Sequence, residues 1–530
     1  MPIAKTHCAV CKQPAVVATT STIDSSLFTT YQCGHTDIQK KISASDFTDF
    51  VSMDGKRPYP FQITGAVFGS EQANGRVLIM DEQGLGKTVQ FLMMVKSHPK
   101  ELTRFLLLCK AGLKAQWSKE IPRWCGEDYV PQILESENDY IMPGVKGLIL
   151  SFDTLWRFKD IPAFMKRARI KFVGLDEVQH IKNTNSKRTN GVREAVAQVK
   201  YVAGLSGTPI KNNAGEFFPI LNMLRPDIPA FRTKSIFDQT VVDTYYDGHK
   251  IKYGGLKSAQ KFKELTKDFI IRRTRQEVLP ELPVITRDYR YSQLGPIVEE
   301  AYKDTFKQFR NYSLYGGISD SAAERTANTL AYLTKMRHIT GIAKIEPCLD
   351  FVADFIEETD RKIVIFAHHK DVRKILYEKL EELRQDNKWP MSPILMLPED
   401  VASRDDTITA FRRPEYRVLI ASTLASSEGL NLQFCSDCIT LERQWNPANE
   451  EQAEGRFIRI GQQANKVTNT YMIAVGTVDE FFAKLVEQKR EIVGDTLAGK
   501  EGAMGNWQES SLMKELAEIL VQQGGKKWGW

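Results

Sequence analysis

Residues 80–90 of this chain read Met-Asp-Glu-Gln-Gly-Leu-Gly-Lys-Thr-Val-Gln, between an apolar run at 77–80 and a helix-like segment at 90–95. An apolar strand that leads through a glycine-containing turn into Gly-Lys-Thr is typical of a phosphate-binding loop. Backbone N–H groups then face the anion, the lysine adds a point charge, and the threonine hydroxyl can ligate Mg²⁺. The residues expected to bind ATP and Mg²⁺ are Gly84, Leu85, Gly86, Lys87 and Thr88. Asp81 stands where the strict pattern has glycine.

The composition predicts a large protein with more than one domain. At 530 residues the chain exceeds a single core, and 42% hydrophobic with 26% charged residues is ordinary for a globular protein. The formal net charge of +6 permits a polyanionic partner without requiring one. Because we find neither an apolar run of about 18 residues nor an apolar signal core, we expect a cytoplasmic protein that does not enter a membrane.

Four residues near the N-terminus have the spacing of a structural zinc site. Cys8 and Cys11 form a Cys-x-x-Cys pair, and Cys33 and His35 follow after a segment rich in threonine and serine. Two such pairs suit a tetrahedral Zn²⁺ that holds a small ribbon together. We expect a closed, structural Zn²⁺ site, with His7 as a competing ligand and unconnected thiols as the alternative.

The segment just before the phosphate loop carries a candidate adenine contact. From Arg57 the sequence reads Arg-Pro-Tyr-Pro-Phe-Gln, in which two prolines precede an expected short amphipathic helix. The amide of Gln62 can make paired hydrogen bonds with adenine while the ring of Phe61 packs beside the base. Taken alone, Phe61 is more often a core residue and Gln62 a surface residue. Their position ahead of a phosphate loop favours the adenine contact.

Alternating strand-like and helix-like segments follow the phosphate loop. They lie at 104–109, 113–124, 147–150, 171–175 and 201–205. This βαβα rhythm predicts a mostly parallel sheet with helices on both faces, in which ligands bind at the carboxyl ends of the strands. Asp176 and Glu177 stand at such an end. We expect Asp176 to hold Mg²⁺ through its waters and Glu177 to orient and deprotonate the attacking water.

Two later segments give weaker indications of function. Ser206-Gly-Thr-Pro209 follows its own strand and offers hydroxyls on a tight turn beside the expected γ-phosphate, where it can transmit the nucleotide state. From Arg225 to about Gly341 the strand rhythm is lost, and we expect a helical, charged segment. Its basic cluster at 271–275 is either a solvated face or a phosphate contact of a nucleic-acid motor.

A second βα series begins near residue 362 and has no phosphate loop of its own. Its strand-like segments are 362–366, 394–397, 417–421, 438–441 and 467–473. Arg456 and Arg459 are three residues apart, so on a helix they share a face and can reach one anion together. The economical hypothesis is a composite ATP site, with the phosphate loop and carboxylates on one lobe and arginine fingers on the other.

Two remaining features favour simple interpretations. Cys435 and Cys438 form another Cys-x-x-Cys pair, but no second ligand pair lies nearby, so we expect burial beside a strand. The sequence Gly-Gly-Lys-Lys-Trp-Gly-Trp at 524–530 is expected to be a flexible end, with a partner-docking peptide as the alternative.

Taken together, these segments resemble the Swi/Snf-type DNA translocases of helicase superfamily two over about residues 55–490. The motifs that carry the resemblance are PFQITGAVF, DEQGLGKTVQ, LKAQWSKEIPRW, DEVQHIKNTNSK, LSGTPIKNNAGEFFPILNMLRPD, IIRRTRQEVLPELP, KIVIFAHHKDV, EGLNLQF, QWNPANEEQAEGRFIRIGQ and GTVDE. The motif IFAHHK is most similar to the annealing-helicase (HARP-like) branch. The stretch SSEGLNLQF resembles bacterial RNA-polymerase-associated members.

This resemblance implies two RecA-like lobes, Mg-ATP hydrolysis stimulated by DNA, and sequence-independent tracking along duplex or branched DNA. It implies that Gln62 contacts adenine and that Asp176 and Glu177 form the Walker B pair. It adds Gln452, Arg456 and Arg459 as γ-phosphate sensors and fingers, and Gly429 with Asn431 as the motif that couples ATP to DNA. Three departures leave these residues intact: Gln179 replaces a common histidine, Lys110 a usual proline, and Ser426 and Ser427 a common glycine pair.

The expected fold class is α/β, with two RecA-like parallel-sheet lobes, helical insertions and a small N-terminal ribbon. The expected domains are 1–45 (ribbon), 46–290 (ATP-binding lobe, with an insertion from about 225), 291–345 (helical linker), 346–492 (second lobe) and 493–530 (tail).

The expected function is that of a monomeric DNA-dependent ATPase that remodels DNA in repair or recombination, by fork remodelling, strand annealing or displacement of bound protein. An RNA-polymerase-associated recycling ATPase and a strand-separating helicase are the alternatives, with RNA polymerase or replication and recombination proteins as candidate partners. A module that binds ATP only as a structural ligand is disfavoured, because it would need neither Glu177 nor Arg459.

Overall fold

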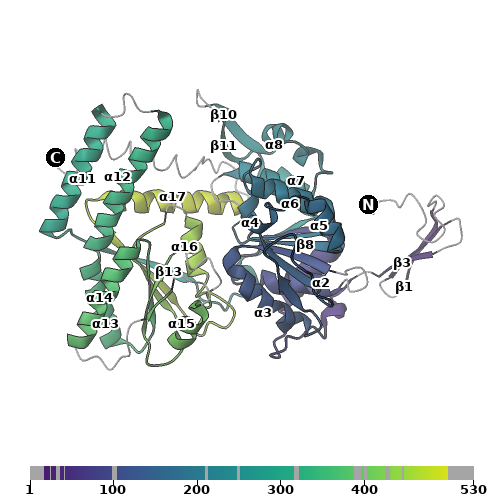
Figure 1. The fold of residues 1–530 in the computed structure, drawn as a ribbon, viewed down its shortest axis with the longest axis horizontal. Helices are drawn as coiled ribbons and strands as arrows, with labels where there is room; N and C mark the ends of the chain where they lie inside the picture. The colour runs from purple at the N-terminus through teal and green to yellow at the C-terminus, as the bar shows by residue number, and fades with distance from the viewer. Residues whose placement is uncertain are drawn as a thin grey trace. The chain divides into compact units, whose positions relative to one another are not determined.

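The computed structural model describes residues 17–23, 26–31, 36–40, 42–73, 75–97, 104–208, 213–246, 251–315, 321–386, 395–398, 403–423, 430–444 and 447–498. The chain divides into two compact units, each built around its own parallel sheet (Figure 1). The first unit comprises residues 1–209, 217–234 and 263–274, and the second comprises 210–216, 235–262 and 275–530. The expected α/β class with two parallel-sheet lobes is confirmed.

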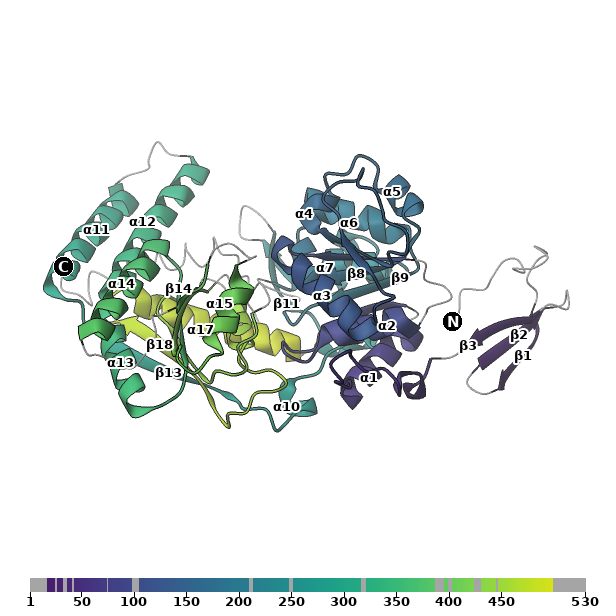
Figure 2. The same cartoon turned by 60° about the horizontal axis from the view of Figure 1, so that its bottom comes forward.

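The first lobe contains a seven-stranded parallel sheet in the order β12-β4-β9-β8-β5-β7-β6. Its elements are α1 (Pro60–Val67), β4 (Arg76–Ile79), α2 (Lys87–Ser97), β5 (Arg104–Cys109), α3 (Lys114–Cys125), β6 (Pro131–Ile133), β7 (Gly147–Ser151), α4 (Phe152–Leu155), α5 (Ile161–Arg167), β8 (Ile170–Asp176), α6 (Lys187–Ala197), β9 (Tyr201–Leu205), α7 (Phe217–Leu224) and β12 (Ile270–Ile271). Helices α2 and α3 lie on one side of this sheet and α5 and α6 on the other (Figures 1 and 2). Both faces are therefore covered, which explains the continuous apolar runs of the strands.

The strand order places three chemically important segments side by side. Strand β9 lies between β4 and β8 in the sheet. The phosphate loop follows β4, the residue Asp176 ends β8, and Ser206 follows β9. Because all three strands are parallel, their carboxyl ends meet at one edge of the sheet, where α/β proteins bind their ligands.

The second lobe contains a six-stranded parallel sheet in the order β13-β18-β17-β14-β16-β15. Its elements are β13 (Ile285–Ser292), α11 (Pro296–Tyr315), α12 (Ala322–Ala343), α13 (Ile345–Glu358), β14 (Ile363–Ala367), α14 (Lys370–Asp386), β15 (Leu395–Met396), α15 (Arg404–Phe411), β16 (Val418–Ser422), β17 (Asp437–Thr440), α16 (Pro447–Glu454), β18 (Val467–Ala474) and α17 (Val478–Ala498). One core joins this sheet to α13 and α14, and a second core joins its opposite face to α15 and the segment after α16. Cys435 and Cys438 are both buried here, as expected.

Strand β13 lies outside its expected domain. We placed the end of the ATP-binding lobe at residue 290, but Ile285–Ser292 pairs along its whole length with β18. The second lobe therefore begins before residue 290. β13 is an edge strand of charged and aromatic residues, so it lacks the apolar run that identified the inner strands.

The segment from Arg225 to Gly341 is only partly helical, which corrects the expectation. It contains α8 (Lys234–Thr240), an antiparallel hairpin of β10 (Val242–Tyr246) and β11 (Ile251–Leu256), α9 (Ala259–Thr266) and α10 (Arg275–Val278) before α11 and α12. Within the described ranges, none of the helices has the length and apolar character that a membrane crossing requires.

The N-terminal segment forms a three-stranded antiparallel sheet of β1 (Val17–Ile23), β2 (Ser26–Tyr31) and β3 (Thr36–Lys40). The four expected zinc ligands, Cys8, Cys11, Cys33 and His35, lie outside the described residues. The described part of the chain contains no cluster of three or more residues suited to bind a metal ion. The Zn²⁺ site stays a prediction.

Candidate functional site

The phosphate loop connects β4 to α2 and adopts a conformation that requires glycine. Gly84 and Gly86 have φ angles of 87° and 73°, in the left-handed region that side chains rarely adopt. A Cβ atom on Gly86 would lie 2.3 Å from Nε2 of Gln62. At the start of α2, Nζ of Lys87 donates to the carbonyl oxygens of Asp81 (2.7 Å) and Glu82 (3.1 Å), so its ammonium group lies against the loop.

Gln62 joins the segment before the loop to the loop itself. Its Nε2 donates to the carbonyl oxygen of Leu85 at 3.0 Å, and its Oε1 accepts from the backbone N–H of Tyr59 at 2.9 Å. The residue is only 2% exposed. The structure therefore brings the candidate adenine contacts next to the phosphate loop. The contact of Gln62 and Phe61 with adenine stays a prediction.

Asp81, the departure from the strict loop pattern, is buried and paired with Arg273. Its carboxylate oxygens accept from Nε (3.0 Å) and Nη2 (2.5 Å) of Arg273, and Oδ2 also accepts from Nε2 of Gln90 at 2.8 Å. The guanidinium group also donates to the carbonyl oxygen of Phe61 and lies over its ring. Arg273 belongs to the basic cluster at 271–275, so this member of the cluster holds the nucleotide lobe together and is not a solvated side chain.

Asp176, the expected Walker B carboxylate, ends β8 and accepts a hydrogen bond from a tryptophan. Nε1 of Trp117, on α3, donates to Oδ2 of Asp176 at 2.8 Å, and the indole is 3% exposed. Burial and the neighbouring Glu177 carboxylate raise the pKa of Asp176 to about 6, against the opposing effects of the Trp117 hydrogen bond and the Lys87 charge. Trp117 lies in the motif LKAQWSKEIPRW, whose sequence alone predicts no role for this side chain.

Glu177 is held by a short chain of hydrogen bonds that reaches the Ser-Gly-Thr segment. Nε2 of Gln179 donates to Oε2 of Glu177 (2.5 Å), and Oγ of Ser206 donates to Oε1 of Gln179 (2.6 Å). Oγ of Ser206 in turn accepts from the backbone N–H of Thr208 (3.0 Å). Glu177 has a φ of 54°, a strained conformation for a residue with a side chain, which is typical of functional sites. Gln179, noted only as a departure from the family, thus links the two motifs.

The residues present fit ATP and Mg²⁺. A Cβ atom on Gly207 would lie 2.6 Å from Cγ of Gln83 and 3.2 Å from the backbone nitrogen of Gln83, so the Ser-Gly-Thr turn packs closely against the loop. Within the described part of the chain, Nε2 of Gln83 and Oγ1 of Thr208 are buried without a hydrogen-bond partner. Such orphaned groups beside a lysine suit phosphate oxygens, and a threonine hydroxyl with an aspartate suits Mg²⁺. The donor set is thus that of a nucleoside triphosphate site.

In the second lobe, the structure joins two of the expected motifs. Nη1 of Arg459 donates to Oδ1 of Asn431 at 2.6 Å, and the backbone N–H of Leu432 donates to the carbonyl oxygen of Arg456 at 3.2 Å. Gln452 is 3% exposed on α16. The expected coupling residue Gly429 lies outside the described residues.

The prediction that Arg456 and Arg459 share a helix face is wrong. Helix α16 ends at Glu454, and both arginines follow it in turns, where the backbone N–H of Gln462 donates to the carbonyl oxygen of Arg459 at 3.0 Å. Gly455 directly follows the helix, and glycine disfavours its continuation by about 1 kcal/mol.

Comparisons with known proteins agree with this geometry. The SNF2-related domain matches residues 61–342, and the helicase conserved C-terminal domain matches residues 343–461. The chain is 26% identical over 461 residues to the DNA annealing helicase and endonuclease ZRANB3 of Mus musculus, covering 83% of this chain and 41% of that protein. It is 27% identical over 474 residues to the SWI/SNF-related matrix-associated actin-dependent regulator of chromatin subfamily A-like protein 1 of Xenopus tropicalis, covering 87% and 47%.

Among solved structures, the helicase domain of Hef from Pyrococcus furiosus matches with a TM-score of 0.50 at 14% identity, over 81% of this chain and 97% of that chain. This likeness shows the fold. The chain spans less than half the length of the two curated relatives named above.

Proposed function

This chain belongs to the SNF2-related family of ATP-dependent helicases, and from that premise we propose that it hydrolyses ATP in order to move along duplex or branched DNA. The single observation that carries the proposal is the meeting of three segments at one sheet edge in the first lobe. These segments are the phosphate loop with Lys87, the carboxylates Asp176 and Glu177, and the turn at Gly207.

The proposed reaction is in-line attack of water on the γ-phosphorus, in which the bond to the β,γ-bridging oxygen breaks and ADP leaves. Lys87 binds the β- and γ-phosphates, and Thr88 and Asp176 would hold Mg²⁺, which when bound neutralises charge on the phosphate oxygens. Glu177 accepts the proton of the attacking water, and Gln179 fixes the Glu177 carboxylate for that task through its 2.5 Å hydrogen bond. The indole of Trp117 keeps Oδ2 of Asp176 in one orientation.

Residues of the second lobe complete the proposal. We expect Arg456 and Arg459 to neutralise γ-phosphate charge, Gln452 to sense it, and Gly429 with Asn431 to pass the nucleotide state to DNA. The hydrogen bond between Arg459 and Asn431 supports a shared task for these motifs.

Steady-state ATP hydrolysis with no DNA, single strands, duplex and a branched fork tests this function. Duplex or fork should raise turnover strongly, and Lys87→Ala should abolish it. Lys96→Ala is the matched control, because Lys96 lies on the same helix but donates to the carbonyl oxygen of Cys125. A Lys87→Ala protein with normal DNA-stimulated turnover would refute the assignment.

The DNA substrate is inferred from the relatives and from the chemistry of translocation. One relative is named a DNA annealing helicase, so re-annealing of a DNA bubble is the reaction to test first. Phosphate contacts make binding sequence-independent and steeply salt-dependent. Unwinding of a tailed duplex without annealing would instead favour a strand-separating helicase. Co-purification with RNA polymerase without DNA would favour a recycling factor.

We further propose that Cys8, Cys11, Cys33 and His35 bind one Zn²⁺ and that this ribbon selects the DNA structure or a protein partner. Support comes from the ligand spacing and from the antiparallel strands β1–β3 around these positions. Metal analysis of the purified protein should give one zinc per chain, and Cys8→Ser should lower this value and weaken the preference for forks. Full zinc retention in Cys8→Ser would exclude Cys8 as a ligand.

A further inference from the structure

Helix α16, which directly precedes Arg456 and Arg459, is held by charges on its buried side. Glu450 and Glu454 lie one helical turn apart and are 1% and 3% exposed. They face the tyrosine Tyr471 of β18, whose hydroxyl donates to Oε1 of Glu454 at 3.0 Å and to Oε2 of Glu450 at 3.3 Å. Ala453 packs into the apolar core, but the carboxylates of the inner face require ion pairs to hold the helix in this position.

Arg443 provides the first of these ion pairs. Its Nε and Nη2 atoms donate to the two carboxylate oxygens of Glu450 at 3.1 and 2.7 Å, and its side chain is 1% exposed. The guanidinium lies 4.3 Å from the ring centroid of Tyr471. Burial would raise the pKa of Glu450, but the charges of Arg443 and Arg490 outweigh it and hold that pKa below its ordinary value.

Arg287, on the edge strand β13, holds the other end of α16. Its Nε and Nη2 atoms donate to the two oxygens of Glu454 at 2.9 and 2.6 Å. Nδ2 of Asn469 adds a third donor to Glu454 at 3.1 Å, and Oγ1 of Thr440 fixes Asn469 at 2.9 Å. Because these contacts are two-pronged, they define the orientation of the helix as well as its distance from the sheet.

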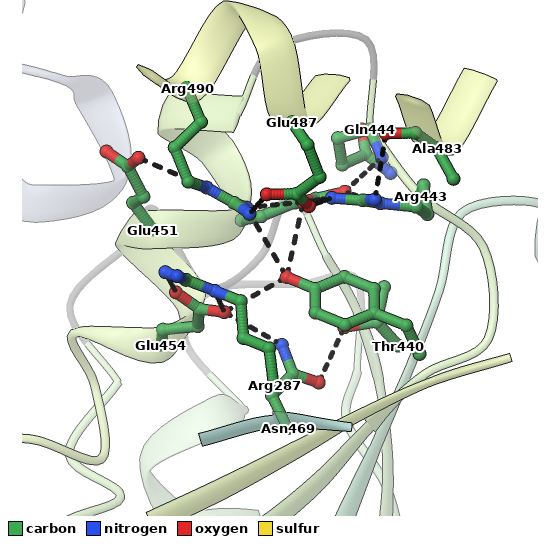
Figure 3. A network of polar contacts seen from close by, with 12 residues as sticks. Arg287, Thr440, Arg443, Gln444, Glu451, Glu454, Asn469, Ala483, Glu487 and Arg490 are labelled. Atoms are coloured by element: carbon green, nitrogen blue, oxygen red, sulfur yellow. Dashed lines mark hydrogen bonds and ion pairs between the residues drawn. The ribbon is translucent and has the colours of Figure 1, made fainter. Parts of the chain in front are cut away.

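The last helix, α17, supplies the remaining members of this polar network. Nη2 of Arg490 donates to Oε2 of Glu450 at 2.9 Å, and its Nη1 donates to Glu487 on the same helix at 2.5 Å. Glu487 also accepts from Nη2 of Arg443 at 2.6 Å. Figure 3 shows Arg490 reaching from α17 toward the side chains of α16. The network therefore ties α17 directly to α16.

The position of α17 in the second lobe does not depend on the polar network. The first half of the helix packs apolar side chains against α11 and α12, among them Phe481, Phe482 and Leu485, which are at most 8% exposed. The charged side chains that α17 adds to the network begin at Glu487, and before it only the carbonyl oxygen of Ala483 accepts from Nη1 of Arg443 at 3.4 Å. Loss of one charged side chain there should leave α17 packed against α11 and α12 and should change only its contacts with α16.

We propose that α17 is a positioning element for ATP hydrolysis, in which Arg490 and Glu487 fix helix α16 and thereby the arginine-bearing segment that follows it. This inference rests on the proposed function, because it takes Arg456 and Arg459 to act on the γ-phosphate. Arg490 and Glu487 are positioning residues: they act through Glu450 and Arg443. The helical pair α11–α12, on which α17 is seated, is thereby connected to the same segment.

The test compares ATP hydrolysis by Arg490→Met, Arg490→Lys and the full wild-type chain at saturating duplex DNA. Arg490→Met should lower kcat about tenfold while the KM for ATP changes less than about twofold, since the bound substrate is unaffected but the second-lobe arginines are misplaced. The kcat of Arg490→Lys should lie between those of Arg490→Met and wild type, because lysine keeps the charge but cannot form the bidentate contact. Lys484→Met, an exposed position on the same helix, is the matched control and should leave kcat unchanged.

Thermal unfolding separates positioning from loss of structure. If Arg490→Met lowers kcat at a temperature where the protein remains fully folded, the proposal holds. An unchanged kcat, or a loss of activity that equals the loss of folded protein, would overturn it. Should Arg490→Met fail to fold, Glu487→Gln gives the same test with a near-isosteric change at a side chain that is 33% exposed. Failure of the proposed function would appear separately, as ATP turnover that survives Lys87→Ala.

Discussion

The ion pair between Asp81 and Arg273 gives a quantitative prediction for the nucleotide lobe. The Asp81 side chain is 0% exposed and accepts hydrogen bonds from two nitrogens of Arg273 and one of Gln90. The substitution Arg273→Met keeps much of the side-chain volume but leaves the buried carboxylate with the amide of Gln90 alone. Removing one partner of a buried ion pair costs about 3–5 kcal/mol, so we expect that loss in the free energy of unfolding of the first lobe.

Hydrogen exchange measured at increasing urea concentration gives the stability of the first lobe separately from that of the second. Peptides from β4 and β5 should lose protection at lower urea in Arg273→Met, whereas peptides from β14 should not change. The double variant Asp81→Asn with Arg273→Met removes both charges and should recover about half of the lost stability. Arg272→Met, the neighbouring member of the basic cluster, should stay within about 0.5 kcal/mol of wild type.

Two outcomes would refute this reasoning. If Arg273→Met and Arg272→Met shift the urea dependence equally, the ion pair contributes no more than an ordinary surface arginine. If the double variant is as unstable as Arg273→Met, the loss does not arise from an unpaired carboxylate. Because Nζ of Lys87 contacts the backbone carbonyl of Asp81, we also expect the KM for ATP to rise in Arg273→Met.

Three further predictions concern single side chains. Trp117→Phe keeps the packed ring but removes the donor to Asp176, so the Mg²⁺ concentration for half-maximal ATPase activity should rise about tenfold; an unchanged Mg²⁺ titration would contradict this. Gln179→Ala frees Glu177, so turnover with DNA should fall about tenfold; unchanged turnover would remove Gln179 from the mechanism. Burial raises the pKa of Glu451 from 4.5 to about 7, so its contribution to stability is present below about pH 4.5 and is lost as the pH rises through 7. Because about a third of the Glu451 side chain is exposed to water, we expect a reduced effect. The difference in unfolding free energy between wild type and Glu451→Gln, measured by urea denaturation, should change by about 1–2 kcal/mol between pH 5 and 8. A difference that is the same at every pH would contradict this prediction.

The parts of the fold that could be predicted are those encoded locally. Most inner strands of both sheets are buried and read as short apolar runs, which identifies them without knowledge of their neighbours, although β18 also carries Thr468, Asn469 and Thr470. The phosphate loop and the carboxylates of Asp176 and Glu177 follow such runs directly. The edge strand β13 has no such run and was placed in the wrong domain, and the hairpin β10–β11 was missed for a similar reason, since four of the five β10 residues are exposed.

The contacts that could not be predicted join residues far apart in the sequence. Arg273 lies 192 residues from Asp81, and Trp117 lies 59 residues from Asp176. Neither pair has a spacing rule, because the strand order that brings the partners together is set by the whole sheet. The helix end at Gly455 differs from these contacts, because the glycine that favours it stands directly in the sequence. The spacing of Arg456 and Arg459 alone did not justify a helix through both residues.

The departure at Asp81 shows why such a pair can exist at a phosphate site. A carboxylate beside a phosphate loop would repel the anion and weaken the effect of Lys87. The structure removes this conflict, because both oxygens of Asp81 accept hydrogen bonds from Arg273 and Gln90, and Nζ of Lys87 contacts the backbone carbonyl of Asp81. The negative charge of Asp81 is therefore compensated by Arg273. In this chain the cation that pairs with the acidic residue of the loop is one of the three arginines in the cluster at 271–275.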